Sequence, residues 1–407
     1  MKRLAYALYK IVQASLNVIA PIITWPIRIV LHRPNVIILQ TYSPFRYGGN
    51  PRYLFEYLSK NTQYSVYWVT ESEDIRRYLS EQGYRYISST RFWERFVIAW
   101  SAQVVIDSGT SYFNYLNLVP KRAVKICTMH GSGPKLTMHR HRELRRTTHF
   151  IKQAHRFDYY SFCTERAKTM LGRNQFLLHS EKMLLLGAPK CDQFYDEKLV
   201  TESRLQRRSL NTIVSDLDPE ARVIYYIPTY RPYPCQLPLL HLDGFDERMF
   251  RMYLEKRNLY FMYSVHSMSA FTKHLESEGR IIYFGFEEHP LVDNNQLLME
   301  ADVIVGDYSQ LATDVAIMRK PQIFVMPDYD TMDHEKGFAE DMRPLIPGPE
   351  ATSYAELVGY MDEYLDRPES YRKGYDSRID LLLNCYMDPT LTNSCERFRE
   401  FIDGQMK

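Results

Sequence analysis

Short apolar runs alternate with longer helical patterns along almost the whole chain, and this alternation constrains the fold most. The runs predicted to be strands are NVIILQ (35–40), SVYWVT (65–70), QVVIDS (103–108), VKICTM (124–129), KMLLLG (182–187), RVIYYIP (222–228), LYFMYSV (259–265), RIIYFG (280–285), DVIVGD (302–307) and QIFVMP (322–327). Apolar strands separated by helices predict α/β units with parallel sheets. A charged helical stretch at 201–218 divides the runs into two groups, which predicts two Rossmann-like domains facing each other.

The predicted boundaries follow from this division near residue 205. We expect an amphipathic membrane-associating segment over 1–34, a Rossmann-like acceptor-side domain over 35–205, a Rossmann-like donor-binding domain over 206–375 and a helical segment over 376–407. The pattern SYAELVGYMDEYL (353–365) is the clearest helix towards the end of the chain.

Composition excludes several classes of protein. A chain of 407 residues with 45% hydrophobic and 25% charged residues is typical of a folded soluble protein with room for two cores. The net charge of +2 argues against a strongly basic nucleic-acid binder. Six scattered cysteines, without CxxC or zinc-spaced histidines, favour a reduced cytoplasmic protein without a structural metal.

The first segment is basic and amphipathic, because no acidic residue precedes Glu56. One helical face carries Leu4, Leu8, Ile11 and Val12, and the other carries Arg3, Lys10 and Asn17. Pro21 and Pro26 interrupt the apolar run, which argues against a membrane-spanning helix. The pattern favours an interfacial helix attracted to anionic lipid, and a helix packed on its own domain is the alternative.

Polar residues follow five predicted strands. The five segments are HGSGPK after 124–129, APKCD after 182–187, PTYRP after 222–228, HPL after 280–285 and DYSQ after 302–307. Turns favour such residues in any protein. Ligands of open α/β sheets nevertheless bind beyond the carboxyl ends of strands, so five such ends together predict one polar cleft.

Three of these segments carry groups suited to acid–base chemistry or phosphate binding. His130 offers an imidazole, and Gly131 and Gly133 let backbone N–H groups approach an anion, although a glycine turn with a surface histidine would look the same. Arg231, between two prolines, suits a bidentate grip on phosphate or an ordinary surface ion pair. His289 is held in extended backbone by Pro290, and a lone histidine more often only satisfies local hydrogen bonds.

The segment GDYSQLATD (306–314) is the strongest candidate. Ser309 or Asp307 is placed to cap a helix running to about Arg319, and free N–H groups at a helix start bind anions. Ser309 would cap the helix with or without a ligand.

A basic stretch covers residues 135–156, with seven Lys/Arg, four His and one acidic residue. It predicts an anionic partner, such as lipid headgroups or a phosphate-rich acceptor, or else a solvated helix face. Nucleic acid fits less well, because few aromatic residues are interleaved.

These segments together resemble the CDP-glycerol glycerophosphotransferase family, the bacterial polymerases and primases of teichoic acids and related capsules. Residues 297–330 resemble its signature aD-x-lItDYSS…D…nKPiif. HGSGPK is similar to its HGTPLK element, GAPKCDQF to GYPRND, IPTYRP to APTWR, and HPL to its HP element. The blocks occur in the family's order, from about residue 44 to the end.

The resemblance implies a GT-B fold and transfer of a polyol phosphate, glycerol phosphate by default, from a CDP-activated donor to an acceptor hydroxyl, with release of CMP. The implied acceptor is lipid-linked or polymeric, and the implied location is peripheral, at the cytoplasmic face of the bacterial membrane. No cofactor and no metal is implied. The catalytic residues carried over are His130 as general base, His289 and Asp314.

Donor phosphates are expected at Arg231, Ser309, Gly306, Asp307, Gln310 and Lys135, and the acceptor or membrane at Arg140, Arg142, Arg145 and Arg146. The sequence departs from the family at Ser132-Gly133-Pro134, which replaces Thr-Pro-Leu, and at Gln310, which replaces the second serine of DYSS. The alternatives are therefore a CDP-ribitol-dependent ribitol-phosphate transferase and a GT-B glycosyltransferase that uses a nucleotide sugar.

Overall fold

The computed structural model describes residues 34–109, 119–131, 133, 135, 151–152, 154–231, 233–265, 269 and 271–406. They form two compact units, described separately below. Unit 1 contains the described residues of 1–130, 153–160 and 395–407, and unit 2 contains those of 131–152 and 161–394. The predicted amphipathic segment lies outside the described residues, apart from residue 34.

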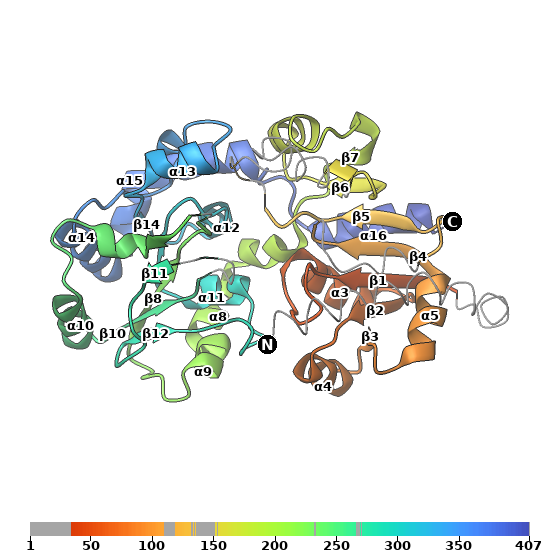
Figure 1. Ribbon diagram of the computed structural model, residues 1–407, viewed down its shortest axis with the longest axis horizontal. Coiled ribbons are helices and arrows are strands. Elements are labelled where there is room, and N and C mark those ends of the chain that lie inside the picture. The colour runs from red at the N-terminus through yellow and green to blue at the C-terminus, as the bar shows by residue number, and fades with distance from the viewer. Residues whose placement is uncertain are drawn as a thin grey trace. The chain divides into compact units, whose positions relative to one another are not determined.

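Unit 1 is an α/β unit built on a parallel sheet (Figure 1). Its elements are β1 (Val36–Gln40), α3 (Gly49–Asn61), β2 (Ser65–Val69), α4 (Glu73–Glu81), β3 (Arg85–Ile87), α5 (Phe92–Ser101), β4 (Ala102–Asp107), β5 (Val124–Cys127), β6 (Tyr159–Ser161) and α16 (Ser394–Gln405). The strands lie in the order β3-β2-β1-β4-β5-β6. All five residues of β1 are buried, because parallel strands are covered by helices on both faces.

The last helix of the chain, α16, belongs to unit 1. The hydroxyl of Tyr64 donates a hydrogen bond of 2.5 Å to Asp403, and the rings of Tyr159 and Phe401 meet edge to face with centroids 5.0 Å apart. These contacts explain why residues 395–406 group with a unit that begins some 350 residues earlier in the chain.

Unit 2 contains a five-stranded parallel sheet in the order β12-β10-β8-β13-β14, and a two-stranded sheet of β9 and β11. Its strands are β7 (Met183–Leu184), β8 (Arg222–Ile227), β9 (Cys235–Gln236), β10 (Leu259–Tyr263), β11 (Phe271–Lys273), β12 (Ile281–Tyr283), β13 (Val303–Gly306) and β14 (Gln322–Phe324). Its α-helices are α7 (Glu165–Ala167), α8 (Glu197–Gln206), α9 (Arg208–Ile213), α10 (Glu247–Lys256), α11 (Asn294–Glu300), α12 (Leu311–Ile317), α13 (Tyr329–Glu335), α14 (Tyr354–Asp366) and α15 (Pro368–Tyr386). Shorter helical turns are η3 (Lys168–Arg173), η4 (Ser180–Lys182), η5 (Pro189–Tyr195), η6 (Pro238–His241) and η7 (Arg343–Leu345).

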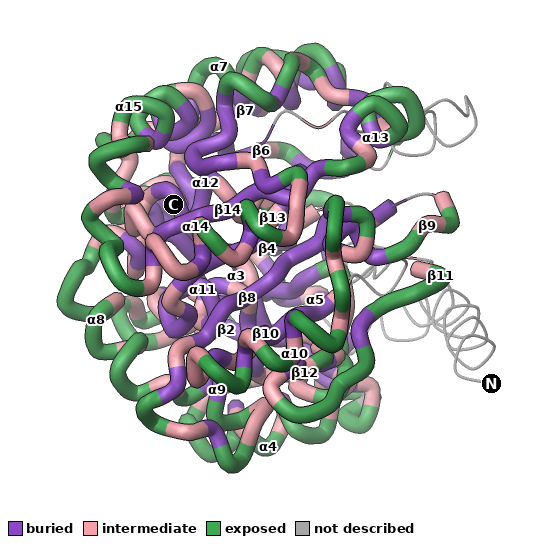
Figure 2. The backbone as a smooth tube through the Cα atoms, turned by 90° about the vertical axis from the view of Figure 1, so that its left-hand side faces the viewer, coloured by how far each residue is buried: buried purple, intermediate pink, exposed green. Residues whose placement is uncertain are grey.

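The core of unit 2 lies along its central strands, which Figure 2 shows as buried tube. Val223, Ile224 and Val305 are fully inaccessible to solvent, and β13 pairs with β8 through the register Val305↔Tyr226. The helix predicted at 353–365 is α14, which begins at a capping box of Ser353 and Glu356.

Each of the ten predicted strands has a counterpart, although β7 keeps only two residues of the predicted 182–187. β3, β6, β9 and β11 were not predicted. The compact units also divide the chain differently from the predicted boundary near residue 205, because residues 161–205 group with unit 2.

Lys320 fixes the end of α11 within unit 2. Its ammonium donates hydrogen bonds to the carbonyl oxygens of Leu298 (2.8 Å), Met299 and Ala301 (2.7 Å). The last carbonyls of a helix have no partner inside the helix, so Lys320, in the turn between α12 and β14, supplies a donor to each of these three.

We expect Lys320→Met to lower the free energy of unfolding by about 2–3 kcal/mol, because three carbonyl oxygens lose a charged donor at once. Urea unfolding followed by circular dichroism measures the change. Lys373→Met, at an exposed position of α15, is the matched control and should shift the midpoint little. Equal midpoints for the two variants would contradict the role of Lys320.

Candidate active site

The centre of the unit 2 sheet is a topological switch point. Strand order reverses between β8 and β13, which lie side by side, so the segments that follow them run to opposite faces of the sheet. Open α/β sheets bind ligands beyond the carboxyl ends of the strands at such a point. The segments following β8 and β13 are PTYR and DYSQ, two of those singled out from the sequence.

A buried charge cluster joins the segments after β8, β13 and β14. Nη1 of Arg231 lies 2.7 Å from Oδ2 of Asp307, and its Nε lies 2.7 Å from Oδ2 of Asp328. Nη2 of Arg231 donates a further bond of 3.1 Å to Asp328, and Nη1 donates one of 2.7 Å to the carbonyl oxygen of Thr229. Arg231 and Asp307 are each 1% exposed, so their ion pair is shielded from water, whereas Asp328 is half-buried.

The two carboxylates have other partners as well. Asp307 accepts the backbone N–H of Thr229 at 2.9 and 3.0 Å. Asp328 accepts hydrogen bonds from the hydroxyls of Tyr233 (2.7 Å) and Tyr308 (3.0 Å). Burial alone would raise the pKa of Asp328, but the hydrogen bonds and charge of Arg231 lower it overall.

These contacts revise the roles expected for Arg231 and Asp307. Burial opposes the charge of Arg231, but Asp307 and Asp328 raise its pKa overall, so the guanidinium stays protonated. Its N–H groups point to protein oxygens, and the oxygens of Asp307 accept protein N–H groups. Both residues therefore hold the strand ends together, and neither presents the free phosphate-binding group that the sequence predicts.

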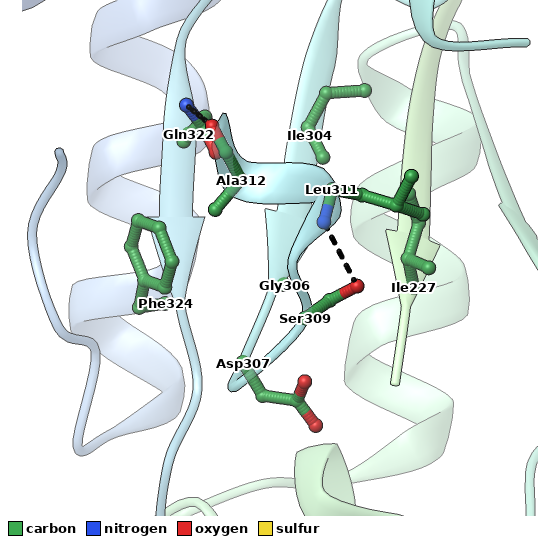
Figure 3. A pocket seen from close by; sticks show the side chains of 9 residues that line it. All are labelled: Ile227, Ile304, Gly306, Asp307, Ser309, Leu311, Ala312, Gln322 and Phe324. Carbon is green, nitrogen blue, oxygen red and sulfur yellow. Dashed lines mark hydrogen bonds between the residues drawn. The ribbon is translucent and has the colours of Figure 1, made fainter. Parts of the chain in front are cut away.

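A small pocket lies beside this cluster, at the start of α12 (Figure 3). Its wall includes Ile227, Ile304, Gly306, Asp307, Ser309, Leu311, Ala312, Gln322 and Phe324. Oγ of Ser309 accepts a hydrogen bond of 3.3 Å from the backbone N–H of Leu311, the first residue of α12. The N-cap position is Gln310, whose side chain makes no capping bond, so the prediction that Ser309 or Asp307 is the N-cap is wrong. The helix ends at Ile317 rather than near Arg319. Ser309 and Gln310 are half-buried and reach the surface of unit 2.

Asp314 lies on the buried face of α12, not in this pocket. It is 3% exposed, pairs with the ammonium of Lys190, and accepts a 3.5 Å hydrogen bond from Sγ of Cys191. Burial opposes the charge of Lys190, but Asp314 raises the pKa of the lysine overall. A carboxylate held in a buried ion pair has no access to a substrate proton. In this structure Asp314 therefore joins α12 to η5, and its catalytic role stays a prediction.

His289 lies in the segment between β12 and α11. The side chain is half-buried, with its ring edge to face with Phe284 at 6.4 Å between centroids. Its carbonyl oxygen accepts the N–H of Val292 at 3.1 Å. His289 thus follows the carboxyl end of an edge strand of the same parallel sheet, as predicted.

Two glycines of the glycine-containing segment 131–135 pack against Gln310. They are Gly131 and Gly133. A Cβ atom at Gly131 would lie 1.9 Å from Oε1 of Gln310, and one at Gly133 would lie 2.6 Å from its Cγ. The backbone of Lys135 forms an antiparallel bridge with Phe338. The two departures from the family pattern, at residues 133 and 310, are therefore in direct contact.

In unit 1, His130 follows β5 at a shaped turn. Asn50, 2% exposed at the start of α3, donates hydrogen bonds to the carbonyl oxygens of Thr128 (3.0 Å) and Met129 (2.9 Å). Met129 has a left-handed φ of 55°, which turns the chain so that the imidazole of His130 is exposed. Nδ1 of His130 lies 3.4 Å from the carbonyl oxygen of Ser108.

The switch point of unit 1 lies between β1 and β4. Nε2 of Gln40 donates a 2.6 Å hydrogen bond to Asp107, whose other oxygen accepts the N–H of Gly109 at 3.2 Å. The turn that carries His130 is tied to the same residue, because the N–H of Thr128 bonds to the carbonyl oxygen of Asp107 at 2.8 Å.

Several positions important to these sites were not singled out from the sequence. They are Asn50, Tyr233, Asp328 and Lys336. Asp328 follows the predicted strand 322–327 directly, so the rule applied to the other strand ends would have found it. Lys190 lies in the predicted strand-end segment APKCD, but its pairing with Asp314 has no local signal, because the two residues are 124 apart in the chain.

Arg140, Arg142, Arg145 and Arg146 lie outside the described residues. Among the residues that are described, no group of three or more His, Cys, Asp or Glu side chains is placed to hold a metal ion. Within the same part of the chain, no helix is both long enough and apolar enough to cross a bilayer.

We expect Arg231→Gln to lower the free energy of unfolding by about 3–5 kcal/mol, because it leaves two carboxylates without their buried cation. Adding Asp307→Asn should recover part of that loss. Urea unfolding measures both, with Arg372→Gln at an exposed site as the control. A stable Arg231→Gln protein that only loses affinity for a phosphate ligand would restore the role predicted from the sequence.

We also expect Gly133→Ala to destabilise the protein by about 1–3 kcal/mol, because its methyl group would overlap the middle of the Gln310 side chain. Gln310→Ser should remove most of that cost in the double variant, which a double-mutant cycle measures by thermal unfolding. Gly374→Ala on α15 is the control, since no atom lies within 4 Å of its added Cβ. Purely additive effects would show that the two positions do not interact.

Comparison with known proteins identifies the family. The sequence model described as CDP-Glycerol:Poly(glycerophosphate) glycerophosphotransferase matches residues 25–393. The teichoic acid poly(glycerol phosphate) polymerase of Staphylococcus epidermidis is 23% identical over 381 residues, which cover 86% of this chain and 47% of that protein. The teichoic acid ribitol-phosphate polymerase TarK of Staphylococcus aureus is 25% identical over 215 residues, 50% of this chain and 40% of that protein. The chain spans about half the length of these relatives or less.

Solved structures agree on the fold. A variant of the wall teichoic acid polymerase TagF, soaked with CDPG, has a TM-score of 0.70 at 18% identity and covers 92% of this chain and 90% of that chain. This likeness confirms the predicted fold class, an α/β protein of GT-B type with two Rossmann-like parallel sheets. Because the family model matches most of its length, the chain belongs to the CDP-glycerol:poly(glycerophosphate) glycerophosphotransferase family.

Proposed function

We propose that this protein transfers a polyol phosphate, glycerol phosphate by default, from a CDP-activated donor to a hydroxyl group of an acceptor and releases CMP. The observation that carries the proposal is the match of the family model over residues 25–393, a range that includes His130, His289 and Ser309. The placement of the DYSQ segment at the switch point of unit 2 supports it, since nucleotide ligands of open α/β sheets bind there.

The reaction is a phosphoryl transfer. The acceptor oxygen attacks the phosphorus that carries the polyol, the bond from this phosphorus to the bridging oxygen breaks, and CMP leaves with that electron pair. The acceptor hydroxyl loses its proton to a base. The protein's contribution is to position the two substrates, remove the proton and balance the charge on the phosphates.

His130 is the proposed base. Its imidazole is exposed, and the carbonyl oxygen of Ser108 near Nδ1 favours the tautomer with hydrogen on Nδ1. Nε2 then carries the lone pair that accepts the proton. Asn50 holds the carbonyl groups of the two preceding residues, so the backbone that presents the ring is fixed before the acceptor arrives.

The donor is proposed to bind unit 2. Ser309 and His289 are half-buried, follow the carboxyl ends of β13 and β12, and carry groups that hydrogen-bond phosphate oxygens. Gln310 contributes a side-chain amide at the same turn. The buried ion pair of Arg231 and Asp307 fixes the backbone after β13, which carries Ser309 and Gln310.

A second donor is favoured by a specific observation. TarK, with 25% identity over half of this chain, is a ribitol-phosphate polymerase by name. The chemistry at phosphorus is the same for both polyols, so CDP-ribitol is the alternative donor.

The relatives carry the names of teichoic acid enzymes, and we propose that the acceptor is a lipid-linked or polymeric chain of that kind at the cytoplasmic face of the membrane. The acid-free sequence before Glu56 supports attraction to an anionic membrane surface.

We expect His130→Ala to lower the rate of CMP release at least ~10²-fold, as loss of a general base does. The fold should be unaffected, because the side chain is exposed. His179→Ala, another exposed histidine, is the matched control and should keep full activity.

The assay supplies the full chain with a lipid-linked acceptor extract and measures CMP released from CDP-glycerol and, separately, from CDP-ribitol. A UDP-sugar and a CMP-sugar form the third arm. Turnover of a nucleotide sugar without release from either CDP-polyol would replace the proposal with the glycosyltransferase alternative. Near-normal turnover by His130→Ala would remove His130 from the mechanism.

A further inference from the structure

Two half-buried lysines in unit 2 lack the partners that other buried cations of this unit have. Lys135 lies in the glycine-containing segment, and Lys336 follows the last residue of α13. The antiparallel bridge between Lys135 and Phe338 brings the two residues close together. Among the residues that the structure describes, neither ammonium group has an ion-pair or hydrogen-bond partner.

The nearby carboxylates are not available to these lysines. Asp307 accepts hydrogen bonds from Arg231 and the N–H of Thr229, and Asp328 accepts them from Arg231, Tyr233 and Tyr308. Lys336 instead lies with its Nζ 5.3 Å from the centre of the Tyr230 ring, a cation–π contact that leaves the ammonium hydrogens unused.

The electrostatic environment shows that the two ammonium groups disfavour each other. Burial and, after it, the charge of Lys336 lower the pKa of Lys135 to about 7. The charge of Asp307 raises the pKa of Lys135, and the charge of Arg231 lowers it. Burial also lowers the pKa of Lys336. Like charges held together and shielded from water are unfavourable without an anion between them.

The sum of charges indicates which ligand would complete the arrangement. Lys135, Lys336 and Arg231 carry three positive charges, and Asp307 and Asp328 carry two negative ones. The net charge of these five groups is therefore +1 when both lysines are protonated, and both carboxylates already accept hydrogen bonds from Arg231, so an anion that brings its own oxygen acceptors would complete the arrangement. A diphosphate esterified at both ends has one negative charge on each phosphoryl group, and an ammonium can hydrogen-bond to either.

We propose that Lys135 and Lys336 together form a phosphate-binding site for the diphosphate of the donor, with Lys336 a specificity-determining contact that the sequence comparison did not assign. This inference rests on the proposed function, because it takes the diphosphate from a CDP-polyol. It also implies that donor binding near pH 8 takes up a proton, since a free Lys135 is largely neutral there and becomes charged when the anion arrives.

The sign of the pH dependence follows from the lowered pKa. Below pH 7 Lys135 is already protonated, so affinity is greatest there. As pH rises through about 7 the site must acquire a proton in order to bind, and affinity falls. A CDP-polyol keeps the same charge over this range because both of its phosphates are esterified, so the change reports the protein.

The test is calorimetric titration of the full chain with CDP-glycerol, inorganic pyrophosphate and cytidine, at pH 6.5 and 8.5 and in buffers of different ionisation enthalpy. For Lys336→Met we expect Kd for CDP-glycerol and pyrophosphate to rise on the order of 10-fold or more, with cytidine unaffected. Proton uptake at pH 8.5 should also fall, because Lys135 regains a more normal pKa without its neighbour. Lys336→Arg should restore affinity, and Lys373→Met should match the wild type.

The outcomes separate this inference from the proposed function. Loss of pyrophosphate affinity in Lys336→Met, restored in Lys336→Arg, supports the lysine site even if the protein never turns over a CDP-polyol. Turnover of CDP-glycerol by the wild type with unchanged affinity and proton uptake in Lys336→Met overturns the lysine site and leaves the function standing. A Lys336→Met protein that fails to fold is replaced in the same test by Lys336→Gln, and affinity of that variant equal to the wild type also overturns it.

Discussion

One buried guanidinium connects the ends of three neighbouring strands, and the rest of unit 2 is arranged around it. Arg231 follows β8, Asp307 follows β13 and Asp328 follows β14. Removing three charged groups from water costs several kcal/mol per ion, and this cost is offset only where each charge finds short, well-directed partners. Here Arg231 donates hydrogen bonds to both carboxylates and to a carbonyl oxygen. The hydroxyls of Tyr233 and Tyr308 donate further hydrogen bonds to Asp328. The three segments that would meet a ligand are thereby fixed relative to one another before it binds.

The position of α13 depends on the same interaction. The helix begins at Tyr329, directly after Asp328, so the residue that anchors its first turn is also a member of the cluster. The helix ends at Glu335, and Lys336 follows it directly. The glycine-containing segment then joins this region through the bridge between Lys135 and Phe338 and through the contact of Gly133 with Gln310. Glycine at 133 and glutamine at 310 fit each other, because the longer side chain uses the space that a larger residue at 133 would need. Two positions that depart from the family pattern, 133 and 310, are therefore in contact in this protein.

The sequence predicted the strands well and the roles of buried polar residues poorly, for a physical reason. Runs such as NVIILQ and RVIYYIP are apolar on both faces, which only a strand covered on both sides explains. β3 and β6 were missed because three residues with one or two buried side chains leave no periodic signal. His130, His289 and Ser309 were correctly placed at strand ends because chain order alone determines that position in a parallel sheet. The buried ion pairs of Arg231 and Asp314 were not predicted, since burial and the identity of a partner across the fold cannot be derived from a local motif.

That failure also shows how a cation's role can be inferred in this protein. Arg231 and Lys190 are both nearly inaccessible to solvent, and each is paired with a carboxylate, so their charge is used within the fold. Lys320 has no carboxylate but bonds to three carbonyl oxygens at the end of α11, which is again a structural use. Lys135 and Lys336 are half-buried, close to each other, and have neither kind of partner among the described residues. Among the described residues, this unit supplies oxygen acceptors to each of those three side chains and none to the ammonium groups of Lys135 and Lys336. A ligand that carries its own phosphate oxygens can provide the missing acceptors.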